Sequence, residues 1–225
     1  MCEASAIDRL ALRDHLRVRS ESEDHVKTGV EKSATKSQGR PRHGAREDEA
    51  EPIRFEATLY SLEGQCILRL PEVASKKLPS RGQVAVHGTL QGCALQTVLE
   101  PDGDFGHWMR IDAALKKAAG IDSGDSVRVE VTPSQAWPEP SVPPDLKRAL
   151  ADAPQAIREL GEAITPMARW EWVRWVNATK NPATRKRRVE VSLSKLGSGK
   201  RRPCCFNLAA CTDPDLAKNG KLIGG

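Results

Sequence analysis

Apolar and polar residues alternate along QVAVHGTLQGCALQTVLE, residues 83–100. Such alternation, with a period of two, is typical of β-strands that bury one face. The pair Gln91-Gly92 interrupts the pattern, and a short glycine-containing break between two such runs favours a hairpin turn. We therefore predict two antiparallel strands joined at Gln91-Gly92.

The same type of pattern continues on both sides of this hairpin. Predicted strands lie at 53–60, 64–70, 107–112 and 123–133, with a helical or turn insert at 72–78 and a short helix at 113–120. Glu63-Gly64 favours a turn between the first two strands, and Gly120 is a typical helix end. Five to six short strands with little helix indicate a small β-barrel domain, residues 53–134.

A proline-rich linker, residues 135–143, separates this barrel from a predicted all-helical domain, residues 144–203. Inside that domain, Thr165-Pro166 and Asn181-Pro182 each place a capping side chain directly before a proline. This combination is typical of helix starts, because proline suits the first helical position.

Both ends of the chain are expected to lack a fixed fold. Residues 1–52 have mixed charge and few apolar side chains, so they cannot bury enough surface to offset the chain entropy. We predict a disordered N-terminal extension there and a flexible, cysteine-containing tail at 204–225. The expected fold class is α+β: a small β-barrel followed by a small all-helical domain, with a disordered N-terminal tail.

The helical domain concentrates tryptophan and arginine in TPMARWEWVRWVNATKNPATRKRR, residues 165–188. On a helical wheel, one face carries a stripe that we predict to be core: Ala168, Trp172, Trp175, Val176 and Thr179. Trp170 points to the opposite side, next to Arg174. There it either packs against the linker or the barrel, or stacks on a ligand beside a cation.

The next predicted helix places Arg185 at the start of its apolar stripe. A buried arginine needs a carboxylate or several carbonyl partners, and Glu162 or Glu171 could supply one. Alternatively, Arg185 forms an anion-binding site together with Arg188. The candidate binding residues are accordingly Trp170, Arg174, Arg185 and Arg188.

Motifs for catalysis or metal binding are missing from the sequence, which has no phosphate loop, nucleophile elbow or HExxH. His107 is expected to be packed or on the surface rather than to act as a general base. Zinc would need four ligands, and no histidine follows His107 to join the thiols of Cys204, Cys205 and Cys211. We predict no catalytic residues, no metal and no cofactor, and we favour a non-enzyme. Whether the three thiols are redox-active stays open.

Positive charge is concentrated toward the C-terminus, since residues 136–225 carry 16 Lys or Arg and 9 Asp or Glu. This excess is either an ordinary solvated face or a patch for an anionic partner. No apolar run approaches the length of about 18 residues that a membrane span needs. The first residues also lack the apolar core of a secretory signal. We therefore expect no membrane span and a cytoplasmic location.

Two blocks of the sequence resemble known families. Residues 53–133, with LPEVASKKL, VAVHGTLQG and HWMRIDAALKKAAGIDSGDSVRVEV, resemble a bacterial domain of unknown function that often precedes a helical module. Residues 142–203, with the motif W-V-x-x-T-K-x-P-x-T-R-x-x-R at 175–188, resemble the YdeI/OmpD-associated (bacteriocin-protection) family. The chain departs from that family at Ala178-Thr179-Lys180, where Ala-Lys is usual.

The resemblance implies a double-split-type barrel, related to the swapped-hairpin barrels of bacterial transition-state regulators and often dimeric. It also implies a role in tolerance of bacteriocins or antimicrobial peptides, and it carries over no catalytic residues. The leading hypothesis is a non-enzymatic stress-tolerance protein that binds a protein or an anionic ligand through its helical domain.

Two alternatives are kept beside this hypothesis. One is a nucleic-acid-binding or regulatory protein that uses the basic C-terminal helices, which is not favoured because the barrel is net acidic. The other is a small-ligand binder or enzyme with a pocket between the barrel and the helices, lined by Arg185 and Trp108.

Overall fold

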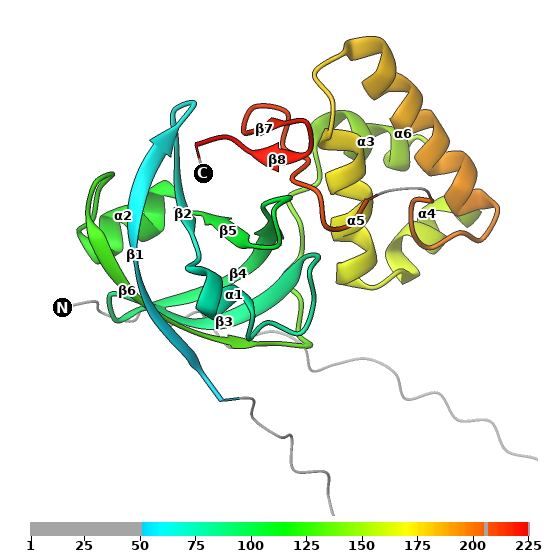
Figure 1. Cartoon of the computed structure of the whole chain (residues 1–225). Coiled ribbons are helices and arrows are strands. Elements are labelled where there is room, and N and C mark those ends of the chain that lie inside the picture. Colours follow the sequence, from blue (N-terminus) through cyan, green and yellow to red (C-terminus); the bar gives the residue numbers. More distant parts are fainter. Residues whose placement is uncertain (1–50, 205–206, 225) are drawn as a thin grey trace, which may run out of the picture. The chain divides into compact units, whose positions relative to one another are not determined.

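The computed structural model describes residues 51–204 and 207–224. The N-terminal extension that we predict to be disordered spans residues 1–52, and residues 1–50 of it lie outside the described residues. The described part begins with barrel strands, continues with helices and closes with a short β-hairpin (Figure 1).

Six antiparallel strands close into a barrel in the order β1-β2-β5-β4-β3-β6, drawn in cyan and green in Figure 1. They are β1 Ile53–Leu62, β2 Gln65–Arg69, β3 Val84–Leu90, β4 Cys93–Pro101, β5 His107–Arg110 and β6 Ser126–Pro133. Both predicted hairpins are confirmed. The turns at Glu63-Gly64 and Gln91-Gly92 have positive φ at both central residues, which matches the right-handed twist of the flanking strands.

Aliphatic side chains from alternate strand positions fill the barrel. The most enclosed are Leu59, Leu68, Val86, Leu90, Leu99, Met109, Val127 and Val131. At Gly88 the strands β3 and β6 approach so closely that a Cβ would lie 1.9 Å from the carbonyl oxygen of Glu130. The alternation read from the sequence thus selects the inward face, and glycine permits the closest strand contact.

Two short helices accompany the barrel, α1 Glu72–Ser75 and α2 Ala113–Ala119. The Asp112 carboxylate caps α2 by accepting a hydrogen bond from the Leu115 backbone N at 2.7 Å. Gly120 ends the helix in the left-handed conformation, with φ of 65°. The predicted helix at 113–120 therefore starts and stops at the residues with the appropriate local chemistry.

Four helices form the second part: α3 Pro144–Ala151, α4 Gln155–Ala163, α5 Pro166–Asn177 and α6 Pro182–Gly197. The side chains of Thr165 and Asn181 cap α5 and α6 as predicted. Trp172 and Val176 are buried, and the rings of Trp172 and Trp175 meet edge to face at 5.8 Å. No helix in the described ranges is both long enough and apolar enough to cross a membrane.

The C-terminal segment differs from the flexible tail expected at 204–225. Residues 207–224 are ordered and contain the hairpin of β7 Ala217–Lys218 and β8 Lys221–Leu222, which turns at Asn219-Gly220. Three of its side chains pack on two barrel residues: Cys211, Leu216 and Leu222 against Ile67 and Trp108. The segment is fixed because it buries these apolar groups, which the sequence analysis did not recognise as a core.

Candidate binding site

A cavity of about 130 Å³, here called the junction cavity, is lined by β4, β5, α5 and the segment before β7. Its charged lining residues are Glu100, Arg110, Arg174 and Asp213. The remaining lining residues are Trp108, Trp170, Val173, Asn177, Thr212 and Pro214. Residues from both folded parts and from the C-terminal segment thus surround one space.

A buried ion pair joins β4 to α5 at this cavity. Arg174 Nε lies 3.0 Å from Glu100 Oε2, and the Arg174 side chain is 5% exposed. Arg174 also donates to the carbonyl oxygens of Leu208 and Ala210. Burial raises the pKa of Glu100, although Arg174 and the Gln83 amide, which donates at 2.6 Å, act to lower it. The guanidinium therefore ties the helix to both the barrel and the C-terminal segment.

Two indole rings provide the aromatic part of the cavity wall. Trp108 Nε1 donates to the carbonyl oxygen of Pro101 at 3.3 Å. Trp170 Nε1 donates to the carbonyl oxygen of Pro138 in the linker at 2.7 Å. Because both indole N–H groups already have acceptors, the two rings offer the cavity only their apolar surface.

Arg110 lies at the edge of the cavity, over the Trp108 ring. Its guanidinium carbon is 5.7 Å from the ring centroid, and its Nη2 donates to Asp213 Oδ2 at 2.6 Å. Asp213 Oδ1 accepts from the backbone N of Asp215 and of Leu216, so the carboxylate is anchored on both sides. The Arg110 side chain remains half exposed.

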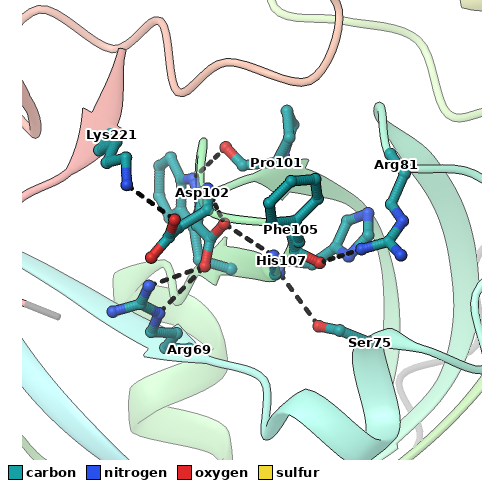
Figure 2. A network of polar contacts seen from close by, with 11 residues as sticks. Arg69, Ser75, Arg81, Pro101, Asp102, Phe105, His107 and Lys221 are labelled. Carbon is teal, nitrogen blue, oxygen red and sulfur yellow. Dashed lines mark hydrogen bonds and ion pairs between the residues drawn. The ribbon is translucent and has the colours of Figure 1, made fainter. Parts of the chain in front are cut away.

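The turn between β4 and β5 is held by the buried carboxylate of Asp102 (Figure 2). Asp102 Oδ1 accepts from the backbone N of Asp104 at 2.7 Å and of Gly106 at 2.8 Å. Its Oδ2 accepts from Arg69 Nη2 at 2.8 Å. Burial by itself would raise the pKa of Asp102, but these donors lower it overall. Asp102 therefore has the turn-stabilising role that is usual for aspartate.

Strand β5 starts directly after this turn with a buried histidine. The His107 backbone N donates to Ser75 Oγ at 3.1 Å, and its ring Nε2 lies 3.0 Å from the carbonyl oxygen of Gly82. Burial lowers the pKa of His107. It is a packed histidine, as expected. Glu100 and Trp108 are paired across the two strands, so the same turn sets both residues in the cavity wall.

The C-terminal hairpin docks on this turn through the backbone. The Leu222 backbone N donates to the Asp102 carbonyl oxygen at 2.7 Å. A Cβ on Gly103 would lie 1.9 Å from the carbonyl oxygen of Gly220, so only glycine permits the approach. This docking fixes the segment that supplies Asp213 to the cavity.

Two of the four candidate binding residues come together. Trp170 and Arg174 line the junction cavity, whereas Arg185 and Arg188 do not. Arg188 Nη1 donates to the carbonyl oxygen of Trp175 at 2.7 Å, and its guanidinium stacks on the ring of the same residue. The predicted anion site of Arg185 and Arg188 is therefore not part of the junction cavity.

The expected partner of Arg185 was wrong. Arg185 binds Asp145 through Nε at 2.6 Å and Nη2 at 2.9 Å, rather than Glu162 or Glu171. Glu171 binds Arg202 instead. The partner depends on how α3 packs against α6, and a helical wheel of one helix contains no such information.

Sequence reasoning missed three charged residues of the cavity. It placed Trp108 in a pocket between the barrel and the helices, but combined it with Arg185 instead of Arg110. Glu100 and Arg110 carried a usable signal, because charged residues near the ends of two strands flank the same turn. Asp213 had a weaker signal, the turn-prone run Asp213-Pro214-Asp215.

Metal and thiol chemistry find little support in the described residues. Among them, no group of three or more His, Cys, Asp or Glu side chains could hold a metal ion. Burial raises the pKa of Cys211 to about 11, so this thiol is not a thiolate at neutral pH. Cys204 is exposed, and Cys205 lies outside the described residues.

Comparison with known families divides the chain in the same way as the fold. Residues 55–131 match the family described as "Domain of unknown function (DUF1905)", and residues 139–199 match the one described as "Bacteriocin-protection, YdeI or OmpD-Associated". No curated protein matches the chain. The first match covers the barrel side of the junction cavity and the second covers its α5 side. The chain is therefore similar to the DUF1905 family over its barrel, and to the bacteriocin-protection, YdeI or OmpD-associated family over its helices.

Proposed function

We propose that the protein is a non-enzymatic binding protein of bacterial stress tolerance that contributes to protection against bacteriocins, with the junction cavity as its binding site. The description of the second family supports the biological role. The cavity supports the binding role, because both family domains contribute to its walls. This moves the expected interaction surface from the helical domain alone to its junction with the barrel.

The observation that carries the proposal is that contacts within the protein hold the walls of the cavity. Arg174 and Glu100 are held by their ion pair, by Gln83 and by two backbone carbonyls. The Trp108 and Trp170 rings are likewise fixed by their own hydrogen bonds. Walls held by contacts within the protein reduce the entropy lost on binding, and fixed polar groups beside aromatic rings can orient a ligand.

The lining residues support binding over catalysis. Serine, cysteine and histidine, the usual nucleophiles and general bases, are not among the lining residues in the described part. Glu100 has a raised pKa, but its oxygens are occupied by Arg174 and Gln83. A carboxyl group held in this way positions the helix on the barrel.

The test uses a nisin-sensitive bacterial host that produces the full chain and is challenged with purified nisin. We expect the chain to raise the inhibitory nisin concentration, and Thr212→Phe to abolish this effect by filling the cavity. Thr58→Phe is the matched control, because Thr58 is an exposed threonine on β1 that does not line the cavity.

Equal protection by the chain and by folded Thr212→Phe would show that the cavity has no part in the function. No protection by the unmodified chain would remove nisin-type bacteriocins from the proposal. The cytoplasmic location expected from the sequence and the homodimer implied by the family resemblance stay predictions.

A further inference from the structure

The polar groups around the junction cavity differ in how much hydrogen-bonding capacity they have left. Both oxygens of Glu100 and both oxygens of Asp213 already accept hydrogen bonds or ion pairs. The two indole N–H groups are also engaged. The acceptors of the wall are therefore largely used within the protein.

By contrast, some hydrogen-bond donors in the cavity wall are not fully used within the protein. The Arg110 guanidinium lies over the Trp108 ring and donates through Nη2 to Asp213, while its Nε and Nη1 have no hydrogen-bond acceptor among the described residues. Thr212 is half-buried and lines the cavity, and in the described ranges its hydroxyl group has no hydrogen bond to a side chain. A guanidinium presents its N–H groups in a planar fork that matches a carboxylate.

Asn177 adds a donor whose orientation is fixed by its neighbour. Arg185 Nη1 donates to Asn177 Oδ1 at 3.1 Å. Because a guanidinium can only donate, the oxygen of the amide must face Arg185 and its NH₂ group must face away. Arg185 thus acts as a positioning residue for a donor of the cavity wall. This is a different role from the direct anion contact expected of it.

The charges near these donors do not oppose a bound anion. Glu100 is paired with Arg174, and Asp213 is paired with Arg110. The C-terminal end of α5 carries partial negative charge, and Arg188 offsets it by donating to the Trp175 carbonyl oxygen. The apolar surface of Trp108 and Trp170 lies in the same wall.

We infer that the junction cavity binds a carboxylate group carried by a short apolar or single-ring body, with the carboxylate on Arg110, Asn177 and Thr212. The body lies against the indole rings. The cavity of about 130 Å³ is close to the volume of roughly 150 Å³ that holds a benzene ring. This inference rests on the proposed function of the cavity and names the chemistry that it recognises.

Such a carboxylate has two sources, a free small acid or the C-terminus of a peptide. We would measure both by isothermal titration calorimetry on the full chain. The probes are N-acetyl-phenylalanine, N-acetyl-leucine and a hexapeptide that ends in phenylalanine, each as the free acid and as the C-terminal amide. We expect all three acids or the peptide acid to bind, and each amide to bind about tenfold or more weakly than its acid.

Two variants locate the carboxylate. Arg110→Gln is expected to weaken binding of the acids by about tenfold or more and to leave the amides unchanged. Asn177→Asp is nearly isosteric and places a like charge at the site, so it should abolish acid binding. Arg81→Gln is the control, because Arg81 also stacks on an aromatic ring, that of Phe105, but does not line the cavity.

The outcomes separate the two levels of the proposal. Binding of the peptide acid without the N-acetyl amino acids identifies a peptide C-terminus, and binding of all acids identifies a small carboxylate. Equal affinity for acid and amide, no effect of Arg110→Gln, or no binding of any acid would each overturn the carboxylate inference. The nisin experiment with Thr212→Phe tests the cavity itself, so the proposed function can stand when this inference fails.

Discussion

Single side chains near the junction cavity are positioned mostly by backbone partners. Asp102 accepts from two backbone N–H groups of its own turn, and His107 faces the carbonyl oxygen of Gly82. The turn role of Asp102 and the packed state of His107 were predictable, because both follow from local chemistry. The salt bridge between Arg174 and Glu100 was not, because its two residues are far apart in the sequence.

A first prediction concerns the buried imidazole of His107. The pKa of its imidazole in the unfolded chain is near 6.5, and burial lowers this pKa in the folded protein. Between the two values the unfolded chain binds a proton that the folded protein does not. His107 therefore contributes stability that is present above pH 6.5 and is lost as the pH falls through this window.

The measurement is urea unfolding of the protein and of His107→Gln across the pH range from about 5 to 8. The difference between the two free energies of unfolding should change by up to about 1.4 kcal/mol per pH unit. Asp102 and Arg81 face the imidazole and act on its pKa in opposite directions. The raised pKa of Glu100 lowers the free energy of unfolding as the pH rises. Because it does so in both the unmodified protein and His107→Gln, this effect cancels in the difference between them. A pH-independent difference would contradict the prediction.

At the scale of elements, turns and helix caps can be predicted from the sequence, whereas packing partners mostly cannot. Gln91-Gly92 and Asn181-Pro182 mark their turn and helix start because the signal lies in neighbouring residues. Asn219-Gly220 carries the same kind of signal, but strands of two residues are too short to show alternation. The docked hairpin was therefore missed although its turn was visible.

A second prediction tests how this hairpin is held. Gly103→Ala should displace it, because the new Cβ would meet the carbonyl oxygen of Gly220. Gly92→Ala is the matched control, since Gly92 has φ of 78° against 80° for Gly103 but no atom within 4 Å of a new Cβ. Both variants bear a backbone strain of about 1–2 kcal/mol, and only Gly103→Ala should lose more.

Limited proteolysis with trypsin reads out the displacement, because Lys218 and Lys221 lie in the hairpin. We expect Gly103→Ala to be cleaved there faster than Gly92→Ala and faster than the unmodified protein. Equal cleavage of the two variants would mean that the close approach at Gly103 does not hold the hairpin.

For the whole molecule, the basic residues of the C-terminal third are less available to an anionic partner than the net charge of this third suggests. Three of its arginines are engaged inside the protein: Arg185 with Asp145, Arg188 with the Trp175 carbonyl oxygen, and Arg202 with Glu171. The cavity could not be located from the sequence, because its walls come from the distant segments 100–110, 170–177 and 212–214. Which residues line it follows from tertiary packing alone.

A third prediction follows for nucleic acid. We expect labelled duplex DNA to form no stable complex with the protein at about 150 mM salt, where weak phosphate contacts are screened. An electrophoretic mobility shift at low and at physiological salt measures this. A tight complex at physiological salt, weakening steeply as salt is added, would instead support the nucleic-acid hypothesis.

The docked hairpin also has a consequence for how the protein is made. Lys221 binds Asp104 across 117 positions, so the hairpin is synthesised long after the barrel turn that it covers. At roughly 5–20 residues per second, the turn is synthesised between about 6 and 23 seconds before the hairpin that covers Ile67 and Trp108. During that interval this apolar surface is the natural place for a chaperone to bind the nascent chain.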